Sequence, residues 1–323
     1  MSRTVPILDD ARVLALLDEL DIAAALRAMF LSLHVGRSVQ PPQTLTFFPA
    51  DAGDFITYAG VMADAAVFGV KVSPCIVRDP RPRVTAWTLL MSAETGEPLL
   101  LCNSKRLTTE RTAATTALAV DLLAPADARH LAIVGTGDIA EAHLRHILPL
   151  RRWERVRVTS RGAAAAPPLA YTRLTGRDAR VRMCAGVDEA VADADVVLLC
   201  TSSGVAVLDP AQLTKPALIT SVSTNAVRAH EIPPASLASM DVYCDYRRTA
   251  PLSAGEMVIA QADHGWSPES IVGDLPELVA GVITRRAQDR HVFFRSIGLG
   301  LEDIAIAAAV HAVFESHAGE GQA

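Results

Sequence analysis

The N-terminal third of the chain passes from a helical to a strand-like spacing of apolar residues. Apolar side chains recur every three or four positions between residues 11 and 34, which predicts amphipathic helix interrupted near Asp21. Short β-prone runs separated by turn sequences follow at residues 44–48, 55–58, 69–77, 86–92 and 99–102. We therefore expect a mostly antiparallel sheet in this part of the chain.

The rest of the chain alternates apolar strands with helices. An Ala-rich helical segment at 108–123 precedes the apolar strand at 130–134, and another Ala-rich helix is expected at 297–318. Further strands are expected at residues 155–159, 181–184, 195–200, 217–222 and 242–244. Continuous apolar strands that alternate with helices predict a parallel sheet covered on both faces, and hence an α/β protein.

Composition and charge weigh against several classes of protein. Half of the 323 residues are hydrophobic and 20% are charged, which suffices for a sizeable core. The net charge of −6, without a stripe of Lys and Arg, disfavours a nucleic-acid partner. No apolar run approaches the ~20 residues of a membrane span, and Asp9 and Asp10 stand where a signal peptide needs apolar residues. We expect a cytoplasmic protein that acts on a small molecule.

Neither the cysteines nor the histidines predict a metal site. The five cysteines are far apart and form no CxxC pair, and most lie in apolar runs, so we expect buried free thiols. His143 and His146 are three positions apart, but no nearby carboxylates or thiolates complete a zinc site. We expect these two histidines on a solvated helix face.

A glycine-rich loop follows the strand at 130–134. It reads Gly135-Thr136-Gly137-Asp138-Ile139-Ala140 and opens a helix, which is the context of a dinucleotide-binding fingerprint. Gly135 permits the tight turn, Gly137 leaves room for the pyrophosphate, and Ala140 allows close helix packing. The N–H groups of the helix N-terminus would face the phosphates. The motif predicts that Gly135, Gly137, Asp138 and Ile139 bind NAD(P), with an ordinary strand-to-helix turn as the alternative.

The end of the next strand bears on the choice of cofactor. NAD-preferring proteins usually carry Asp or Glu there to accept hydrogen bonds from the ribose, whereas this strand ends in Ser160-Arg161. No carboxylate would repel a 2′-phosphate, and the hydroxyl and guanidinium groups could bind one. We therefore expect NADP(H) as the preferred cofactor, with NAD(H) as the alternative.

Three further segments resemble the ornithine cyclodeaminase/mu-crystallin family. The segment 107–114 resembles its L-T-x-x-R-T-A-A sequence, 69–71 resembles its G-x-K, and 297–303 is similar to its terminal G-x-x-x-E-D helix. Together with the glycine loop between them, the resemblance extends over nearly the whole chain.

The resemblance implies a Rossmann dinucleotide-binding domain inserted in an α+β catalytic and dimerisation domain formed by both termini. Residues 1–124 with 296–323 would form the substrate-binding and dimerisation domain, and residues 125–295 the NAD(P)-binding domain. The implied partners are an amino or imino acid and a second copy of the chain. Family members cyclise ornithine, reduce cyclic ketimines or act as amino-acid dehydrogenases.

The resemblance also implies roles for individual residues. Lys71 and Arg111 match the family's carboxylate-binding cations, which would fix the imine for hydride delivery to one face. Arg111 can clamp a carboxylate, and Lys71 can pair with it or donate a proton if burial lowers its pKa. Hydroxyl contacts with the cofactor are implied for Thr85, Thr112, Thr201 and Ser202, each of which could instead be a capping group.

The chain departs from cyclodeaminases at three places. Asn225 stands where they carry an Asp that activates the substrate amine, although Glu231 of the same stretch matches. An amide cannot accept a proton usefully near neutral pH, so cyclodeamination is disfavoured, but Asn225 can still orient a substrate. Gln43 replaces a further carboxylate-binding Arg, and residues 58–62 lack the family's carboxylate for the substrate amine.

These observations favour an NADPH-dependent reductase of an imino acid. The substrate would be a cyclic ketimine such as Δ1-pyrroline-2-carboxylate, or an imine of a 2-oxo acid and an amine. Lys71, Arg111 and Asn225 are the expected catalytic residues. The alternatives are an amino-acid cyclodeaminase, an amino-acid dehydrogenase and a non-enzymic, mu-crystallin-like binding protein.

Overall fold

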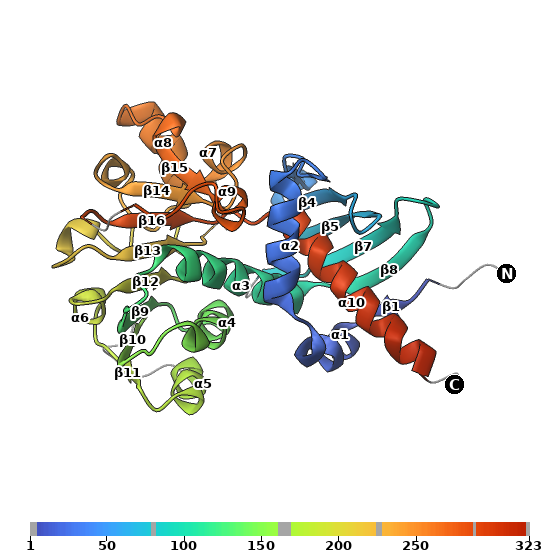
Figure 1. The fold of residues 1–323 in the computed structure, drawn as a ribbon, viewed down its shortest axis with the longest axis horizontal. Coiled ribbons are helices and arrows are strands. Elements are labelled where there is room, and N and C mark those ends of the chain that lie inside the picture. The colour runs from blue at the N-terminus through green and yellow to red at the C-terminus, as the bar shows by residue number, and fades with distance from the viewer. Residues whose placement is uncertain (1–4, 79–81, 161–168, 224–227, 287–288, 321–323) are drawn as a thin grey trace. The chain divides into compact units, whose positions relative to one another are not determined.

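The chain folds into two compact units, each with an eight-stranded sheet (Figure 1). The computed structural model describes residues 5–78, 82–160, 169–223, 228–286 and 289–320. The first unit comprises Met1–Arg111 and Leu299–Ala323, and the second comprises Thr112–Gly298. One division between the units therefore falls inside helix α3 (Lys105–Leu123), before the residue 124 expected from the sequence.

The sheet of the first unit is antiparallel apart from one pair. Its strands are β1 (Ile7–Leu8), β2 (Ser38–Val39), β3 (Thr44–Phe47), β4 (Gly53–Met62), β5 (Val67–Ile76), β6 (Arg83–Val84), β7 (Trp87–Ser92) and β8 (Pro98–Asn103). Their order is β1-β8-β7-β5-β4-β2, with β3 also paired to β4 and β6 to β5. The short strand β1 runs parallel to β8. The antiparallel sheet predicted from the apolar runs is thus confirmed.

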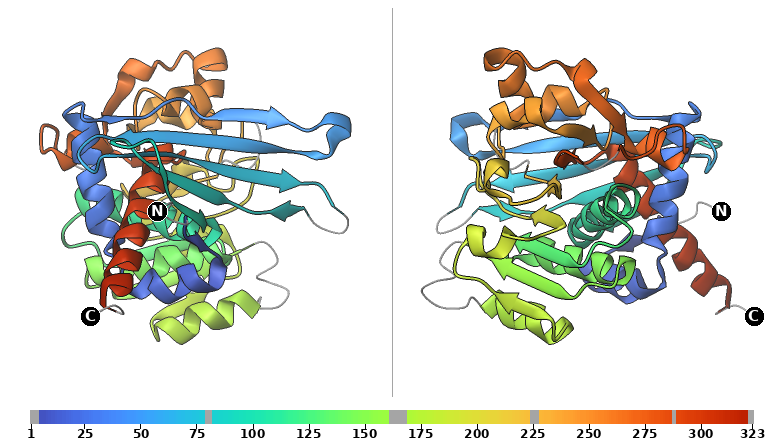
Figure 2. Two further views of the ribbon diagram at one scale, coloured as in Figure 1. Left: turned by 90° about the vertical axis from the view of Figure 1, so that its right-hand side faces the viewer. Right: turned by 60° about the vertical axis from the view of Figure 1, so that its left-hand side comes forward.

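Three helices complete this unit beside the first part of α3. The predicted helical segment is divided at Asp21 into α1 (Asp10–Leu16) and α2 (Ile22–His34). Asp21 is the N-cap of α2: its carboxylate accepts a hydrogen bond from Ala24 N at 2.9 Å, which stabilises the start of the second helix. The C-terminal helix α10 (Gly300–Glu320) contacts β4, β5, β7 and β8 and lies beside α2 (Figures 1 and 2).

Glycines allow the start of α10 to approach the sheet closely. A Cβ atom at Gly300 would lie 2.2 Å from the Ala59 carbonyl oxygen of β4. A Cβ atom at Gly69 of β5 would lie 2.8 Å from Ile304 Cδ1 and 2.3 Å from the Leu89 carbonyl oxygen. No side chain fits at these separations, so glycine at both positions determines how near the helix and strands come.

The second unit has a fully parallel sheet. Its strands are β9 (His130–Val134), β10 (Arg155–Thr159), β11 (Val181–Met183), β12 (Val196–Leu199), β13 (Leu218–Ser221), β14 (Asp241–Cys244), β15 (Ile271–Asp274) and β16 (Val292–Arg295). Their order is β11-β10-β9-β12-β13-β16-β14-β15. The order reverses between β9 and β12, which is the switch point where open α/β sheets bind nucleotides.

The sequence analysis missed β15 and β16. Strand β16 has a run of just three apolar residues, Val292 to Phe294, before the fully buried Arg295. It pairs with β13 and β14, so the last strand in sequence lies inside the sheet and not at its edge. A run of three apolar residues is too short to show the periodicity of a strand or a helix. The position of β16 in the sheet depends on strands that are far away in the chain.

Helices and short turns connect these strands. The helices are α4 (Asp138–Ile147), α5 (Leu169–Arg177), α6 (Val187–Val191), α7 (Ala250–Ser253), α8 (Gly255–Asp263) and α9 (Leu275–Val279). All five cysteines are free and four of them are buried, as predicted. Among the described residues, no helix combines the length and apolar character needed to cross a membrane.

Candidate substrate and cofactor sites

A row of polar side chains crosses the sheet of the first unit. In the strand register, Tyr58 of β4 lies opposite Lys71 of β5, which lies opposite Thr88 of β7. Directly opposite residues share a face, and Gly69, two positions before Lys71, meets Ile304 of α10 on this same face. The Lys71 ammonium group is therefore directed towards the start of α10 from within a mainly apolar strand.

Four buried charges meet at this point. Lys71 Nζ lies 2.7 Å from Asp303 Oδ2, and the Lys71 side chain is 1% exposed. Arg111 of α3 donates from Nε to Asp303 Oδ1 at 3.1 Å and from Nη1 to Glu302 Oε2 at 2.8 Å. We call these residues, Lys71, Arg111, Glu302 and Asp303, the ion cluster. Two cations and two carboxylates compensate one another, which buried charges require.

Neutral groups complete the surroundings of the Lys71 ammonium. Lys71 Nζ lies 4.2 Å from the centre of the Tyr58 ring and donates to Thr108 Oγ1 at 3.3 Å. The Thr108 hydroxyl in turn donates to the Ser104 carbonyl oxygen at 2.8 Å. Thr108 and Arg111 are three residues apart on α3, so the same face of that helix supplies both groups.

The two cations differ in their protonation behaviour. Burial lowers the pKa of Lys71 from 10.5 to about 8, because the charge of Asp303 offsets the loss of solvent only in part and Arg111 repels the ammonium. Burial also opposes the charge on Arg111, but Asp303 and Glu302 outweigh it and raise the pKa of that guanidinium. Arg111 thus stays charged, whereas Lys71 can exchange a proton near neutral pH.

Arg111 retains a donor for a ligand. Its Nη2 makes no hydrogen bond with any residue that the structure describes, while Nε and Nη1 are held by the carboxylates. Its side chain is 5% exposed. The ion cluster can therefore present a fixed guanidinium edge and a titratable ammonium to a small carboxylate.

The glycine loop of the second unit has the geometry that its sequence predicted. Gly135 follows β9 with φ at +132°, and a Cβ atom there would lie 2.3 Å from the Cys200 carbonyl oxygen. Gly137 is the N-cap of α4, with no side-chain cap and nothing within 4 Å of a Cβ atom. Ala140, in the first turn of α4, is fully buried. The open N-terminus of α4 fits the pyrophosphate of a dinucleotide.

Residues at the ends of neighbouring strands lie beside this candidate cofactor site. Val134, Thr159 and Leu199 lie in register, so Gly135, Ser160 and the segment that begins at Cys200 start at one sheet edge. The Ser160 hydroxyl oxygen is buried without a hydrogen-bond partner among the described residues. An orphaned hydroxyl is suited to a cofactor oxygen. Arg161, which the sequence predicts to bind the cofactor together with Ser160, lies outside the described residues.

The Thr201 hydroxyl has an internal partner. It donates to Glu231 Oε1 at 2.7 Å and accepts from Ser203 N at 3.1 Å. The fully buried Glu231 also accepts from the Ser221 hydroxyl at 2.7 Å through Oε2. Glu231 therefore ties the end of β12 to the end of β13 and orders this edge of the sheet.

The other predicted residues are dispersed. Thr85 is half-buried in the first unit, where its carbonyl oxygen accepts from the Ser73 hydroxyl at 3.3 Å. Thr112 is half-buried in α3, Ser202 and Asp138 are exposed, and Ile139 is half-buried in α4. Arg173 of α5 donates to the Asp138 carboxylate at 3.1 Å. Asn225 lies outside the described residues.

The expectation of a solvated face at His143 was wrong. His143 is fully buried, with Nε2 2.9 Å from the Thr116 hydroxyl and Nδ1 2.7 Å from the Ile139 carbonyl oxygen. The imidazole thus joins α4 to α3 through its contact with the Thr116 hydroxyl. No group of three or more potential metal ligands occurs among the described residues.

Sequence reasoning missed the partners of the two cations. The resemblance includes Glu302 and Asp303 in its terminal segment but implies no ion pair for them, and it implies no contact between Tyr58 and Lys71. The signal in the sequence was the acidic pair at the start of a long apolar helix, since such carboxylates could partner buried cations. Carboxylates in a first turn also interact favourably with the helix dipole.

We predict that Asp303→Asn lowers the free energy of unfolding by about 3 kcal/mol, because it leaves Lys71 and Arg111 to share one carboxylate in a buried site. Urea denaturation measures the change. The control is Asp64→Asn, which removes the carboxylate of an exposed ion pair with Arg37 and should change the free energy by less than about 1 kcal/mol. Equal effects of the two substitutions would contradict a structural role for the cluster.

Comparisons with known proteins agree with this architecture. The chain is 55% identical to the NAD(P)H-dependent anabolic L-arginine dehydrogenase of Pseudomonas aeruginosa, over 96% of this chain and 98% of that protein. It is 26% identical to a Δ1-pyrroline-2-carboxylate reductase of Colwellia psychrerythraea, over 72% and 74% of the two chains. The solved structure of the Thermococcus litoralis Δ1-pyrroline-2-carboxylate reductase with NADH and L-proline superimposes with a TM-score of 0.88. That comparison covers 97% of this chain and 98% of the other at 22% identity.

The match to a family extends over residues 5–318. It confirms the resemblance that the 69–71, 107–114 and 297–303 segments suggested. The chain belongs to the ornithine cyclodeaminase/mu-crystallin family.

Proposed function

We propose that this protein is an NAD(P)H-dependent oxidoreductase that forms L-arginine by reductive amination of the corresponding 2-oxo acid. The observation that carries the proposal is the 55% identity to an anabolic L-arginine dehydrogenase along almost its whole length. An ion cluster suited to an α-carboxylate and a dinucleotide loop, both described above, supply the two binding functions that such a reaction needs.

The proposed reaction consumes the 2-oxo acid, ammonia, NAD(P)H and a proton. Ammonia adds to the carbonyl carbon, water leaves, and the resulting imine carbon is reduced by two electrons to the amino acid. NAD(P)+ and water are the other products. This substrate falls within the class expected from the sequence, an imine of a 2-oxo acid and an amine.

Arg111 and Lys71 would have different tasks in this reaction. The guanidinium remains charged, so it can hold the substrate carboxylate throughout. The ammonium, with its pKa lowered to about 8, can give a proton to the oxygen that leaves as water and regain it afterwards. Asn225 would orient the reacting end by hydrogen bonding, which needs no proton transfer.

The cofactor would be held by the second unit. Gly135, Gly137 and the start of α4 would bind the pyrophosphate, and Ser160 with Arg161 the ribose. When bound, the reduced nicotinamide supplies the hydride. Glu231 and Thr201 would keep the adjoining strand ends in place.

A direct assay tests this function. The purified protein should oxidise NAD(P)H when given the 2-oxo acid of L-arginine and ammonia, and L-arginine should accumulate in equal amount. Arg111→Ala should lower kcat/KM at least about 100-fold because the carboxylate loses its charged partner. Lys71→Arg keeps the charge but not the lowered pKa, and should reduce kcat more than it raises KM.

Two other outcomes would replace the proposal. Oxidation of NAD(P)H with Δ1-pyrroline-2-carboxylate alone would favour a ketimine reductase, the activity named for the Colwellia psychrerythraea relative. Release of ammonia from ornithine without net cofactor turnover would indicate cyclodeamination.

We further propose that NADPH is preferred to NADH. The support is the absence of a carboxylate after β10 together with the orphaned Ser160 hydroxyl. Ser160→Asp should lower the ratio of kcat/KM for NADPH to that for NADH at least about tenfold, because a carboxylate there repels a 2′-phosphate. Ser160→Ala is the control and should change the ratio far less. An unchanged ratio in Ser160→Asp would overturn the assignment.

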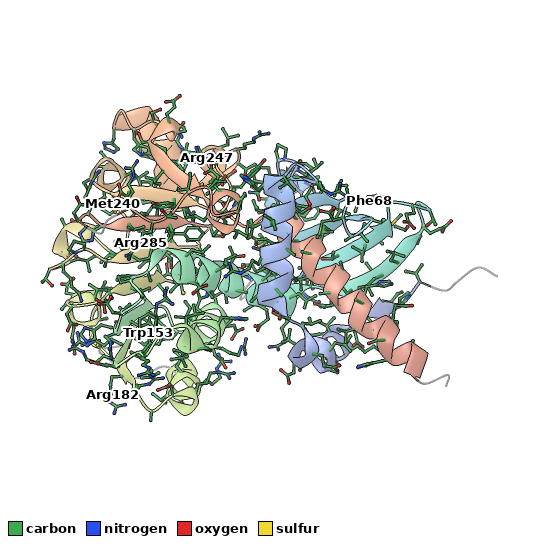
Figure 3. The ribbon with its side chains drawn as sticks, viewed as in Figure 1. Phe68, Trp153, Arg182, Met240, Arg247 and Arg285 are labelled. Carbon is green, nitrogen blue, oxygen red and sulfur yellow. The ribbon has the colours of Figure 1, made fainter. Side chains whose placement is uncertain are left out.

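We also propose a homodimer formed through the outer face of the first unit's sheet. Phe68 of β5, labelled in Figure 3, is 36% exposed, and Val61 of β4 is 37% exposed. Phe68 lies opposite both Val61 and Met91, so these side chains share the face that does not carry Lys71. An apolar patch of this kind is typical of an interface.

Light scattering measures this assembly directly. The wild type should have twice the 34.3 kDa mass of the chain, and Phe68→Lys should shift the mass towards the monomer. Leu31→Lys is the matched control, because Leu31 is an exposed apolar residue of α2 at 46% exposure. A monomeric wild type, or a dimeric Phe68→Lys protein, would contradict the proposed interface.

A further inference from the structure

A carboxylate stands on the Lys71 face of the sheet, beyond the ion cluster. Asp54, Ile56 and Tyr58 alternate along β4 and so share one face, opposite Cys75, Ser73 and Lys71 of β5. Gly60 of β4 and Gly69 of β5 lie against α10. They are on the other side of the Tyr58–Lys71 pair from Asp54. Along this face, Asp54 therefore lies at the end of β4 that is remote from the contact with α10.

Asp54 has no structural task among the described residues. Its carboxylate makes no hydrogen bond or ion pair with any of them, and the residue is half-buried. The opposite residue on β3, Phe47, is 68% exposed. The charge of Asp54 nevertheless acts on the Tyr58 hydroxyl. Burial raises the pKa of Tyr58 to about 12 against the opposing charge of Arg111, and Asp303 and then Asp54 add smaller contributions in the same direction as burial.

The spacing of Asp54 from the ion cluster along β4 is of the same order as the reach of one substrate. Asp54 lies four positions before Tyr58 in β4, so their Cα atoms are about 13 Å apart along the strand. The extended arginine skeleton spans six bonds from the carboxylate carbon to the guanidinium carbon, or about 7 to 8 Å. Hydrogen bonds of about 2.9 Å at each end bring the total to about 13 Å.

The residues between the two ends suit a hydrocarbon chain. Ile56 lies between Asp54 and Tyr58 and offers an apolar surface. Its neighbour across the strands, Ser73, already donates its hydroxyl hydrogen to the Thr85 carbonyl oxygen at 3.3 Å. Three methylene groups can cross this stretch without leaving a polar partner unsatisfied.

We propose that Asp54 binds the guanidinium group of the substrate and so selects a long cationic side chain, an inference that rests on the proposed function. The carboxylate of the substrate is held at the ion cluster and its guanidinium at Asp54. A guanidinium and a carboxylate form a planar, two-bond pair, which a neutral side chain of equal length does not reproduce.

The test compares two substrates that differ in charge at one end. The 2-oxo acids of L-arginine and L-citrulline have the same length, and the second carries a neutral ureido group. Steady-state kinetics with ammonia and NADPH give the ratio of their kcat/KM values. Asp54→Asn should lower this ratio about 10- to 100-fold, the cost of losing a charged hydrogen-bonded pair.

Two variants separate specificity from damage to the fold. Asp51→Asn makes the same change at an exposed acid three residues away and should leave the ratio at its wild-type value. Asp54→Glu keeps the charge on a side chain one methylene longer. It should retain the preference for the guanidino substrate and improve the use of the homologue that is one methylene shorter.

The outcomes distinguish the two proposals. A wild type that reduces the guanidino substrate, with an Asp54→Asn variant of unchanged ratio, would overturn the role of Asp54 and leave the proposed function intact. A wild type that acts on neither substrate would overturn the proposed function and this inference with it.

Discussion

The burial of two cations beside two carboxylates is the constraint on which the first unit depends. Lys71 and Arg111 come from a strand and a helix, and Asp303, which contacts both, comes from the first turn of α10. An unpaired charge at 1% exposure would be costly, so the strand can carry a lysine only if α10 returns to it. Gly69 and Gly300 permit that return. The pairing therefore joins segments 192 residues apart and makes the C-terminal helix part of the N-terminal sheet's core.

Much of this architecture is readable from local pattern. A few consecutive residues suffice to predict the division of α1 from α2 at Asp21, the strand before the glycine loop and the loop itself. The loop is the clearest case: Gly135 has a positive φ and faces the Cys200 carbonyl oxygen, so its identity follows from backbone geometry alone. Lys71 was likewise identifiable, because a lysine inside an apolar run needs a partner wherever that partner lies.

What the sequence could not supply is the identity of such partners. Asp303 is remote from Lys71 in the chain, and no local pattern connects them. The same holds for His143, whose buried place depends on the Thr116 hydroxyl of another helix. The sequence pattern does not predict strand β16, because its position between β13 and β14 is set by pairing and not by composition. In each case the deciding contact is long-range and polar, whereas hydrophobic periodicity reports local burial.

The cluster also explains how two cations of equal charge can act differently. Arg111 contacts both carboxylates, so attraction outweighs burial and its charge is permanent. Lys71 contacts Asp303 alone and feels the repulsion of Arg111, so burial prevails and its pKa falls to about 8. Because the carbonyl carbon of a 2-oxo acid adjoins its carboxylate, the proposed substrate, if anchored at Arg111, would have its reacting carbon near Lys71. The proposed acid and the proposed anchor thus belong to one cluster, and selection of the substrate side chain would take place farther along the sheet.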